Sequence, residues 1–527
     1  MKKIFILFII SFVFLFSCEQ DLMNTVPDDR ISTDIFWQSE QDAIFATIAL
    51  YPTLPGNKLF EYDGITDIFH TNALYDETAV IEAGNADATF NRFLTEWSDA
   101  YTAIWRANNF FENIELLQTN NTQVIDQLKG EVRTIRAYHY IQLVMLFGDV
   151  PLITTNIDID MSKTITRTPV SDIWDYISVE LTLAALDLPL SYADMNIGRV
   201  TKGAALGLKA RAMLFAGRFQ ESADAAKQII DLDLYSLYPS YENLFQYDGE
   251  NCNEVILDHQ FAKDVYPNNY YGPIGPWSLI PGYHGSENVP TKKLIDMYDM
   301  ENGLPINHTN SGFDPMNPYE NRDPRLKQSV FVTGSTLPNG KIFNSIPDDP
   351  NATDAIGGTM YTTTTGWNVK KYISPQDVNT WTNSGINMIL LRYAEVLLTY
   401  AEAKIEMNQV DNSVFEAINQ IRGRQSIGMP PIAQDLNQEE MRALIRKERT
   451  IELAFEGFRL FDIRRWRIAE NVMPGKVYGM TYYNNEELFT AEVTGYVRVF
   501  NANRDYLWPI PQREIELNPN LIQNPNY

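Results

Sequence analysis

Apolar residues recur with a helical period in several blocks of the chain, and most of these blocks come in consecutive pairs. The block from Gln123 to Phe147 is typical, because its apolar positions fall on one face when it is drawn as a helix. Gly148 and Pro151 follow it directly, and both residue types end helices. This pattern predicts a mostly α fold. The predicted helices are Trp97–Leu117, Gln123–Phe147, Val170–Leu186, Lys202–Ala216, Phe219–Leu232, Ile389–Met407, Asp411–Arg424, Gln438–Ala454 and Phe458–Asn471.

Small residues mark the predicted helical hairpin that turns at Gly217. Gly207 and Ala210 on its first helix allow a neighbour to approach closely, and Gly217-x-Phe219 followed by Ala223 partly matches the tetratricopeptide pattern. The leading Trp and closing Pro of that pattern are absent, and plain core packing produces the same small-residue spacing. Four helical hairpins in two distant parts of the chain favour a scaffold of four tetratricopeptide-like helical pairs.

The middle of the chain has a different character. From about Tyr235 to Asn387 the helical period disappears, and Pro, Gly, Asn, Tyr and Trp dominate. Loops held by a rigid scaffold often carry binding residues. We therefore expect one domain over residues 18–527, with an N-terminal helical part (18–234), an irregular, loop-rich ligand-binding insert with short strands (235–387), C-terminal helical hairpins (388–473) and a tail packed on the scaffold (474–527).

The N-terminus carries an export signal. Lys2 and Lys3 precede an apolar run over residues 4–16, which is shorter than the roughly 20 residues that a membrane-spanning helix needs. The run ends at Ser17-Cys18, which is similar to a bacterial lipobox despite the bulky Phe16. Residues 1–17 are thus predicted to be a lipoprotein signal peptide and Cys18 the acylated first residue of the mature chain. The alternative is ordinary secretion, with Cys18 lost or free.

The net charge limits the classes of binding partner, and the cysteine count excludes an internal disulfide. The net charge of −26 argues against nucleic acid and against electrostatic docking on anionic lipid, so membrane attachment must come from the acyl group. Only Cys252 remains besides Cys18, which leaves the mature chain without an internal disulfide. We expect a large folded body tethered by its lipid anchor.

A series of short motifs, in one order along the chain, identifies a resemblance. They include Glu131-x-Arg133-x-x-Arg136-Ala137, Phe147-Gly148-Asp149-Val150-Pro151 and Leu391-Arg392-Tyr393-Ala394-Glu395, and later Glu448-Arg449-x-x-Glu452-Leu453-x-Phe455-Glu456-Gly457-x-Arg459 and Pro509-Ile510-Pro511. With these motifs the chain resembles the SusD/RagB family of outer-membrane nutrient-binding lipoproteins, across nearly its whole mature length.

The resemblance implies a fold, a location and partners. Such proteins look like scaffolds of four tetratricopeptide-like units with an irregular lobe that carries the ligand site. They cap a SusC-like, TonB-dependent outer-membrane transporter as a hinged lid, and their ligands are usually oligosaccharides or, in one branch, peptides. Glu19 and Asp21 after Cys18 are similar to the signal that exports such lipoproteins to the cell surface.

Three glutamates give the chain its most catalytic-looking feature. Glu448, Glu452 and Glu456 are four residues apart and would share one helix face. A glycosidase needs two carboxyl groups on opposite sides of a sugar, and one of them needs a raised pKa. Arginines crowd the same segment and would keep the carboxylates ionised. We expect a structural ion network here, and no enzyme.

No cofactor is expected from the remaining motifs. The histidines are scattered without ligand-like spacing, and nucleophile-elbow, zinc and phosphate-loop signatures are missing. The acidic stretch from Asp348 to Asp354 could hold calcium through oxygen ligands, but its spacing departs from an EF-hand loop. We therefore expect a solvated turn there and no metal site.

Aromatic residues in loops are the best candidates for ligand contact. Sugars pack their C–H faces on flat rings, while Asn, Asp and Arg bond their hydroxyl groups, and such sites need shape more than charge chemistry. The predicted ligand-binding residues are Asn72, Tyr75, Asp76, Trp97, Trp277, Tyr283, Trp367 and Trp381. For Trp277 and Trp367 an exposed ring is expected, whereas Trp105, Trp174 and Trp466 lie within helical blocks and are expected in the core.

These observations favour a surface glycan-binding lipoprotein that delivers its ligand to a transporter. A peptide-binding lipoprotein of the same uptake type, a surface glycoside hydrolase and a protein-binding adaptor remain as alternatives.

Overall fold

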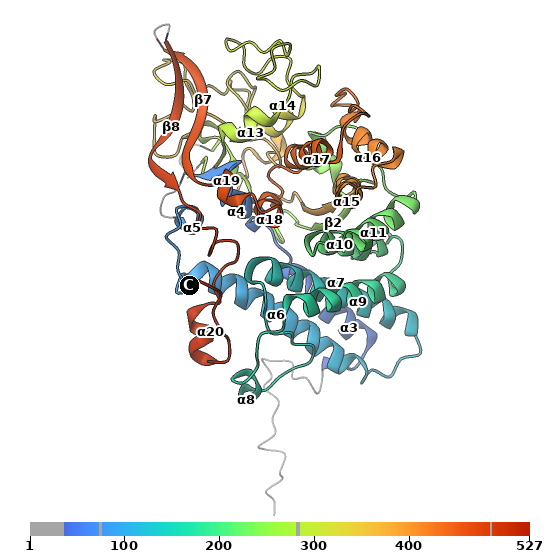
Figure 1. Ribbon diagram of the computed structural model, residues 1–527. Helices are drawn as coiled ribbons and strands as arrows, with labels where there is room; N and C mark the ends of the chain where they lie inside the picture. Colours follow the sequence, from blue (N-terminus) through green and yellow to red (C-terminus); the bar gives the residue numbers. More distant parts are fainter. Residues whose placement is uncertain (1–35, 73–75, 281–284, 485–486) are drawn as a thin grey trace, which may run out of the picture.

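The computed structural model describes residues 36–527 except 73–75, 281–284 and 485–486 (Figure 1). The predicted signal peptide, Cys18, Glu19 and Asp21 lie outside the described residues. The mostly α class is confirmed, with 44% helix and 11% strand. Among the described helices, none combines the length and apolarity needed to cross a lipid bilayer.

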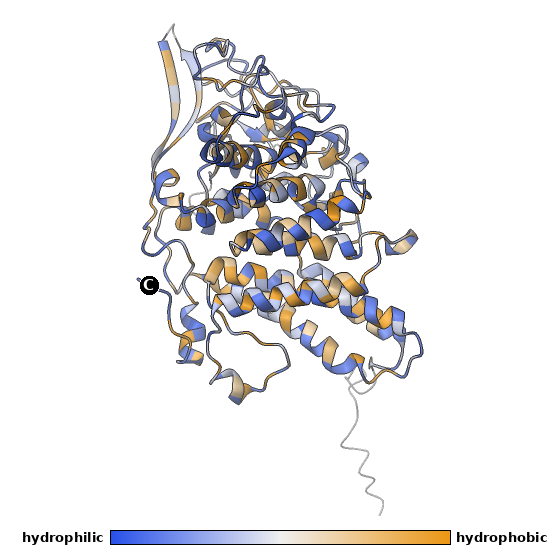
Figure 2. Ribbon diagram, turned by 45° about the vertical axis from the view of Figure 1, so that its right-hand side comes forward, coloured by the Kyte–Doolittle hydropathy of each residue, from blue (hydrophilic) through white to orange (hydrophobic). Residues whose placement is uncertain are grey.

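The long helices form one continuous stack from α6 to α15, in which each packs against the next, and α16 and α17 both pack on α15 (Figure 1). Although residues 232–392 separate α11 from α15, the two helices lie side by side, so the N-terminal and C-terminal helices share one core. Hydrophilic and hydrophobic residues alternate along these helices (Figure 2), as one-sided packing requires. The stack comprises α6 (Asn91–Ile114), α7 (Thr122–Phe147), α9 (Val170–Asp187), α10 (Lys202–Phe215), α11 (Phe219–Asp231), α15 (Tyr393–Glu406), α16 (Asn412–Arg422) and α17 (Gln438–Glu452).

Local sequence explains several helix boundaries and contacts. α7 ends at Gly148, whose φ of 74° is a left-handed value that glycine adopts readily. α17 starts with a capping box in which Asn437 and Glu440 each bond the other's backbone. A Cβ atom on Gly207 would lie 2.4 Å from the Leu391 side chain, so the absence of a side chain there lets α10 meet the strand that carries Leu391.

Short elements connect and flank the stack. The helices are α3 (Glu40–Ile48), α4 (Lys58–Gly64), α5 (Glu77–Glu82), α8 (Ile159–Ser162), α12 (Tyr271–Ile274), α13 (Lys292–Met297), α14 (Arg325–Ser329), α18 (Arg459–Arg465), α19 (Ala469–Val472) and α20 (Gln512–Leu517). Single 3-10 turns are η2 (Tyr51–Thr53), η3 (Asp194–Asn196), η4 (Asn243–Phe245), η5 (Tyr247–Gly249), η6 (Trp277–Leu279) and η7 (Pro375–Asp377).

The strands form two-stranded antiparallel sheets that join distant segments. The pairs are β1 (Phe69–Thr71) with β3 (Asn288–Pro290), β2 (Val255–His259) with β6 (Met388–Arg392), β4 (Val330–Phe331) with β5 (Asn368–Val369), and β7 (Gly475–Asn484) with β8 (Glu487–Arg498). The β1–β3 pair matters most for the site, because it fastens a segment near the N-terminus to the insert.

Two of the predicted helices are wrong in detail, and one hairpin was not predicted. The helix predicted from Ile389 begins at Tyr393, because residues 388–392 are buried on every side and pair with β2 as a strand. The helix predicted over Phe458–Asn471 is interrupted at Arg467, which has a φ of 56°, and splits into α18 and α19. The tail contains the β7–β8 hairpin, which the pattern did not predict and which extends beyond the helices in Figure 1.

A buried ionic network joins the insert to the C-terminal helices. Glu452, at the end of α17, accepts hydrogen bonds from Arg392 (2.8 Å), Arg424 (3.0 Å) and Arg325 (3.0 Å), and all four side chains are buried. Further buried pairs are Arg392–Glu254, Arg392–Glu456, Arg424–Glu254, Arg325–Asp323, Arg325–Glu448, Arg422–Glu448 and Lys371–Glu456. The predicted structural role of the three glutamates is confirmed, although Glu456 lies beyond the end of α17.

The charges in this network perturb one another strongly. Burial alone would raise the pKa of Glu452, but the guanidinium groups of Arg392, Arg424 and Arg325 outweigh it and hold that pKa well below its usual range. Burial lowers the pKa of Lys371 to about 8. Because Glu452 stays ionised, it cannot act as a general acid.

Replacing Glu452 with Gln should lower the free energy of unfolding by about 3–5 kcal/mol, because it leaves buried arginines without their counter-charge. Since the folded-state pKa is depressed, this stabilisation is present above the unfolded-state pKa of about 4.3 and is lost as the pH falls through the folded value. Urea denaturation at several pH values measures it. Asp160→Asn, in the exposed Lys163–Asp160 pair, should change stability by less than about 0.5 kcal/mol. Equal effects of the two substitutions would contradict the account.

Candidate functional site

Three segments far apart in the sequence meet around Asn72, next to the β1–β3 pair. The Asn72 side-chain amide donates to the carbonyl oxygens of Ser286 (2.6 Å) and Thr362 (3.2 Å), and its oxygen accepts from Thr364. The Asn368 amide donates to the Ser286 hydroxyl at 2.9 Å. We call this meeting of Asn72, residues 276–279, residues 285–288 and residues 359–368 the loop cluster.

Two partly exposed aromatic rings, Trp277 and Tyr361, lie in the loop cluster. Trp277 begins η6 and is half-buried, and its ring centroid is 5.9 Å from that of Tyr361, with an interplanar angle of 35°. A Cβ atom on Gly285 would lie 2.9 Å from the Trp277 Cα, so the backbone packs tightly behind the tryptophan. The Ser278 backbone N–H donates to Asp354 at 2.9 Å and anchors the same turn. The rings are therefore held on a fixed backbone.

Trp367 lies in the same segment but is buried. Its side chain is 3% exposed, and its indole N–H donates to the Tyr319 hydroxyl at 3.0 Å. The expectation of an exposed ring is wrong for Trp367, because it belongs to the core beneath the loop cluster. A run of Thr and Gly predicted a loop, but it could not show which side of the loop faces the core.

The other predicted ligand-binding residues are scattered. Asp76 caps α5 by accepting from the Thr78 backbone N–H at 2.7 Å, and Trp381 is half-buried against the core near η7. Tyr75 and Tyr283 lie outside the described residues, in segments adjoining the loop cluster in sequence. Tyr361 was not among the residues predicted from the sequence. Its position directly before the threonine run at 362–365 could have identified it.

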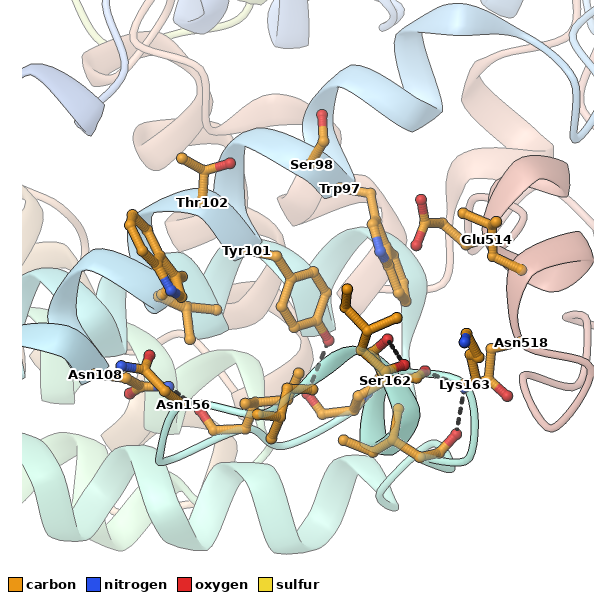
Figure 3. Close-up of a pocket in the computed structure, with 18 of the residues that line it drawn as sticks. Trp97, Ser98, Tyr101, Thr102, Asn108, Asn156, Ser162, Lys163, Glu514 and Asn518 are labelled. Carbon is orange, nitrogen blue, oxygen red and sulfur yellow. Dashed lines mark hydrogen bonds between the residues drawn. The ribbon is translucent and has the colours of Figure 1, made fainter. Parts of the chain in front are cut away.

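Trp97 lies elsewhere, in a groove beside α6 with a volume of about 590 Å³. Trp97 and Tyr101 project from α6 towards the segment with Ser162, and Asn518 lines the groove from the end of α20 (Figure 3). Trp97 is only 4% exposed and packs against Tyr101 at 5.0 Å, and the Tyr101 hydroxyl donates to the Pro151 carbonyl oxygen. The α6 groove therefore has a tryptophan in its floor.

The rim of the α6 groove is apolar and exposed. Trp105, which was expected in the core, is 56% exposed, because none of the described segments covers its side of α6. Ile159 and Leu517 on the opposite rim are 74% and 61% exposed. The Asn108 and Asn518 amides both donate to backbone carbonyl oxygens within the wall. The exposed apolar rim distinguishes this groove from the loop cluster, although Ser98, Thr102 and Lys163 also line it.

The acidic stretch at 348–354 forms a hydrogen-bonded turn. Asp349 accepts from the Asn351 backbone and from the Asn344 amide, which lower its pKa, and Asp354 accepts from Ser278. Across the described residues, no group of three or more His, Cys, Asp or Glu side chains is arranged to hold a metal ion.

The two tryptophans of α6 should respond differently to truncation. Trp97→Ala should lower the free energy of unfolding by about 3–5 kcal/mol, because it opens a cavity in the core. Trp105→Ala should change it by less than about 0.5 kcal/mol, as expected for an exposed position. Chemical denaturation of both variants measures the difference, and a Trp105 variant as unstable as the Trp97 variant would show that the rim is packed.

Comparisons with known proteins agree with this architecture. A family model described as "SusD family" matches residues 253–527, and one described as "Starch-binding associating with outer membrane" matches residues 42–214. A SusD-like protein, P25, of Formosa agariphila is 26% identical over 98% of both chains.

Solved structures show the same fold. A SusD-like carbohydrate binding protein from Bacteroides fragilis is 28% identical, with a TM-score of 0.85, covering 92% of this chain and 100% of its own. A second SusD-like protein from the same species is 27% identical, with a TM-score of 0.81, covering 95% of this chain and 100% of its own.

Proposed function

The chain belongs to the SusD family, and on this premise we propose that it captures an oligosaccharide or polysaccharide at the cell surface and delivers it to a SusC-like, TonB-dependent outer-membrane transporter. The carbohydrate-binding relative from Bacteroides fragilis supports the ligand class, and the family description supports association with the outer membrane. The transporter partner rests on the family resemblance. Glycan-binding proteins of the SusD family are non-catalytic.

The loop cluster is the observation that carries the ligand proposal. It combines the partly exposed Trp277 and Tyr361 rings with the polar, threonine-rich segment 359–368 and with Asn72. Flat rings beside hydroxyl and amide groups suit a sugar, which offers C–H faces and hydroxyl groups. The network around Glu452 and the β1–β3 pair hold these loops on the scaffold, so the site needs little ordering when ligand binds.

Trp277→Ala should weaken glycan binding about tenfold or more, because stacking on an aromatic ring is worth about 1–3 kcal/mol in other ligands. The melting temperature should change little. Affinity electrophoresis against a panel of polysaccharides identifies a ligand, and calorimetry with that ligand gives the affinity of each variant.

Trp367→Ala is the matched control, because Trp367 lies in another segment of the loop cluster but is buried in the core, and its truncation should lower the melting temperature. Unchanged affinity of Trp277→Ala would remove the loop cluster as the site. If the protein binds peptides and none of the polysaccharides, its ligand is a peptide and not a glycan.

Cys18→Ala should release the protein from the membrane without changing its fold. The prediction rests on the apolar run that ends at Ser17-Cys18, which marks Cys18 as the acylated residue. Cell fractionation and labelling with a radioactive fatty acid measure the anchor. An unlabelled wild-type protein, or a variant that stays in the outer membrane without a partner, would contradict it.

A further inference from the structure

Arg464 of α18 is a buried cation that forms no close ion pair within the described residues. Asp505 acts on its charge only from beyond ion-pair distance, and its guanidinium lies 5.8 Å from the Trp508 ring centroid. The Arg464 side chain is 8% exposed, and within the described residues its Nε and Nη1 atoms have no hydrogen-bond partner and its guanidinium forms no ion pair. Its neighbours differ: Arg449 pairs with Asp462, and Arg459 pairs with Asp67. A buried, unpaired charge is unfavourable, so a side chain kept in this state points to a ligand of opposite charge.

Arg464 lines a cavity of about 460 Å³ where α18 meets the ends of α7 and α10, the start of α9 and the C-terminal tail. We call this cavity the arginine pocket. Arg465, Arg467 and Arg504 also line it, and no Asp or Glu is among the described lining residues. In a chain with a net charge of −26, this is an unusual concentration of positive charge.

Two of the four arginines keep their charge for a ligand. Arg465 is neutralised by Glu402 and Asp462, and Arg504 by Asp505. Arg467 is exposed and lies 4.0 Å from the ring centroid of Tyr506, and no carboxylate of the described residues pairs with it or with Arg464. The pocket therefore presents two unpaired guanidinium groups.

The remaining lining residues suit a sugar ring. The Tyr506 hydroxyl is buried and has no hydrogen-bond partner within the described chain. Trp174 and Phe215 supply aromatic wall, and Asn503 supplies an amide. A cavity of this size lies in the range of about 300–1,000 Å³ that small-molecule sites occupy.

We propose that the arginine pocket binds the carboxylate or sulfate group of an acidic sugar residue. The guanidinium fork matches the two or three oxygens of either anion. The saccharide part rests on the proposed function, whereas the anionic part follows from Arg464 and Arg467. The pocket and the loop cluster share no residue, so the two sites can be tested separately.

Calorimetry and thermal melting of the full chain test the proposal, with sodium glucuronate and glucose 6-sulfate as probes and glucose and sodium sulfate as references. At least one acidic sugar should bind and raise the melting temperature, while glucose should not. Arg464→Met and Arg467→Met should each weaken that binding at least about tenfold. Arg513→Met, which removes an exposed arginine of α20 outside the pocket, should leave it unchanged.

Several outcomes would overturn the proposal. Sodium sulfate that stabilises the protein as much as either acidic sugar would make the pocket a free-anion site. Absence of binding by both acidic sugars, or unchanged binding in both pocket variants, would remove the site. Arg464→Met should fold, because it removes an unpaired buried charge, and the exposed Arg467 gives an independent result if it does not.

The result is separable from the proposed function. Trp277→Ala should leave acidic-sugar binding at the arginine pocket intact. Polysaccharide binding lost in Trp277→Ala, without any acidic-sugar binding, would keep the proposed function and reject the pocket. If the wild type binds an acidic sugar but no polysaccharide, and Arg464→Met loses the acidic-sugar binding, the pocket is kept and the proposed function is rejected.

Discussion

The buried carboxylate of Glu452 is the interaction on which most of this structure depends. It receives hydrogen bonds from arginines that precede α15, follow α16 and begin α14, so one side chain links the insert to two C-terminal helices. None of these charges is tolerable in the interior alone, and the segments that carry them must therefore come together. This requirement explains how an insert with few regular elements keeps a defined position on a helical stack.

The segment from Glu448 to Arg465 connects the rest of the molecule. Its glutamates hold the insert, and Arg459 pairs with Asp67 in the N-terminal part, just before β1. β1 in turn pairs with β3 and carries Asn72 at its end into the loop cluster. The loop cluster is thus joined to the helical scaffold through Asp67 and the β1–β3 pair. The α6 groove is built differently, with an exposed apolar rim and amides that bond its own wall.

The sequence predicted the structure well where a pattern of residues is compatible with only one local arrangement. Helical period located the long helices, and arginines among spaced glutamates indicated an ion network. It could not show that the partners of Glu452 are Arg392, Arg424 and Arg325, because they lie far from it in the chain. The arginines of the segment itself pair elsewhere, Arg449 with Asp462 and Arg459 with Asp67. Residues 388–392 are apolar enough for a buried helix or a buried strand, and only pairing with β2 decides. Trp105 was expected in the core and is exposed, and Trp367 was expected to be exposed and is buried. Both expectations failed because exposure depends on which distant segment covers a side chain.

We propose that a glycan binds at the loop cluster and that the helical stack does not rearrange when it binds. Hydrogen exchange of the protein, with and without a polysaccharide that retards it in affinity gels, tests this most directly. The account predicts slower exchange in residues 276–290 and 359–369, with unchanged exchange in α7, α10 and α15. Protection confined to α6 and residues 151–165, or spread evenly over the helical stack, would contradict it.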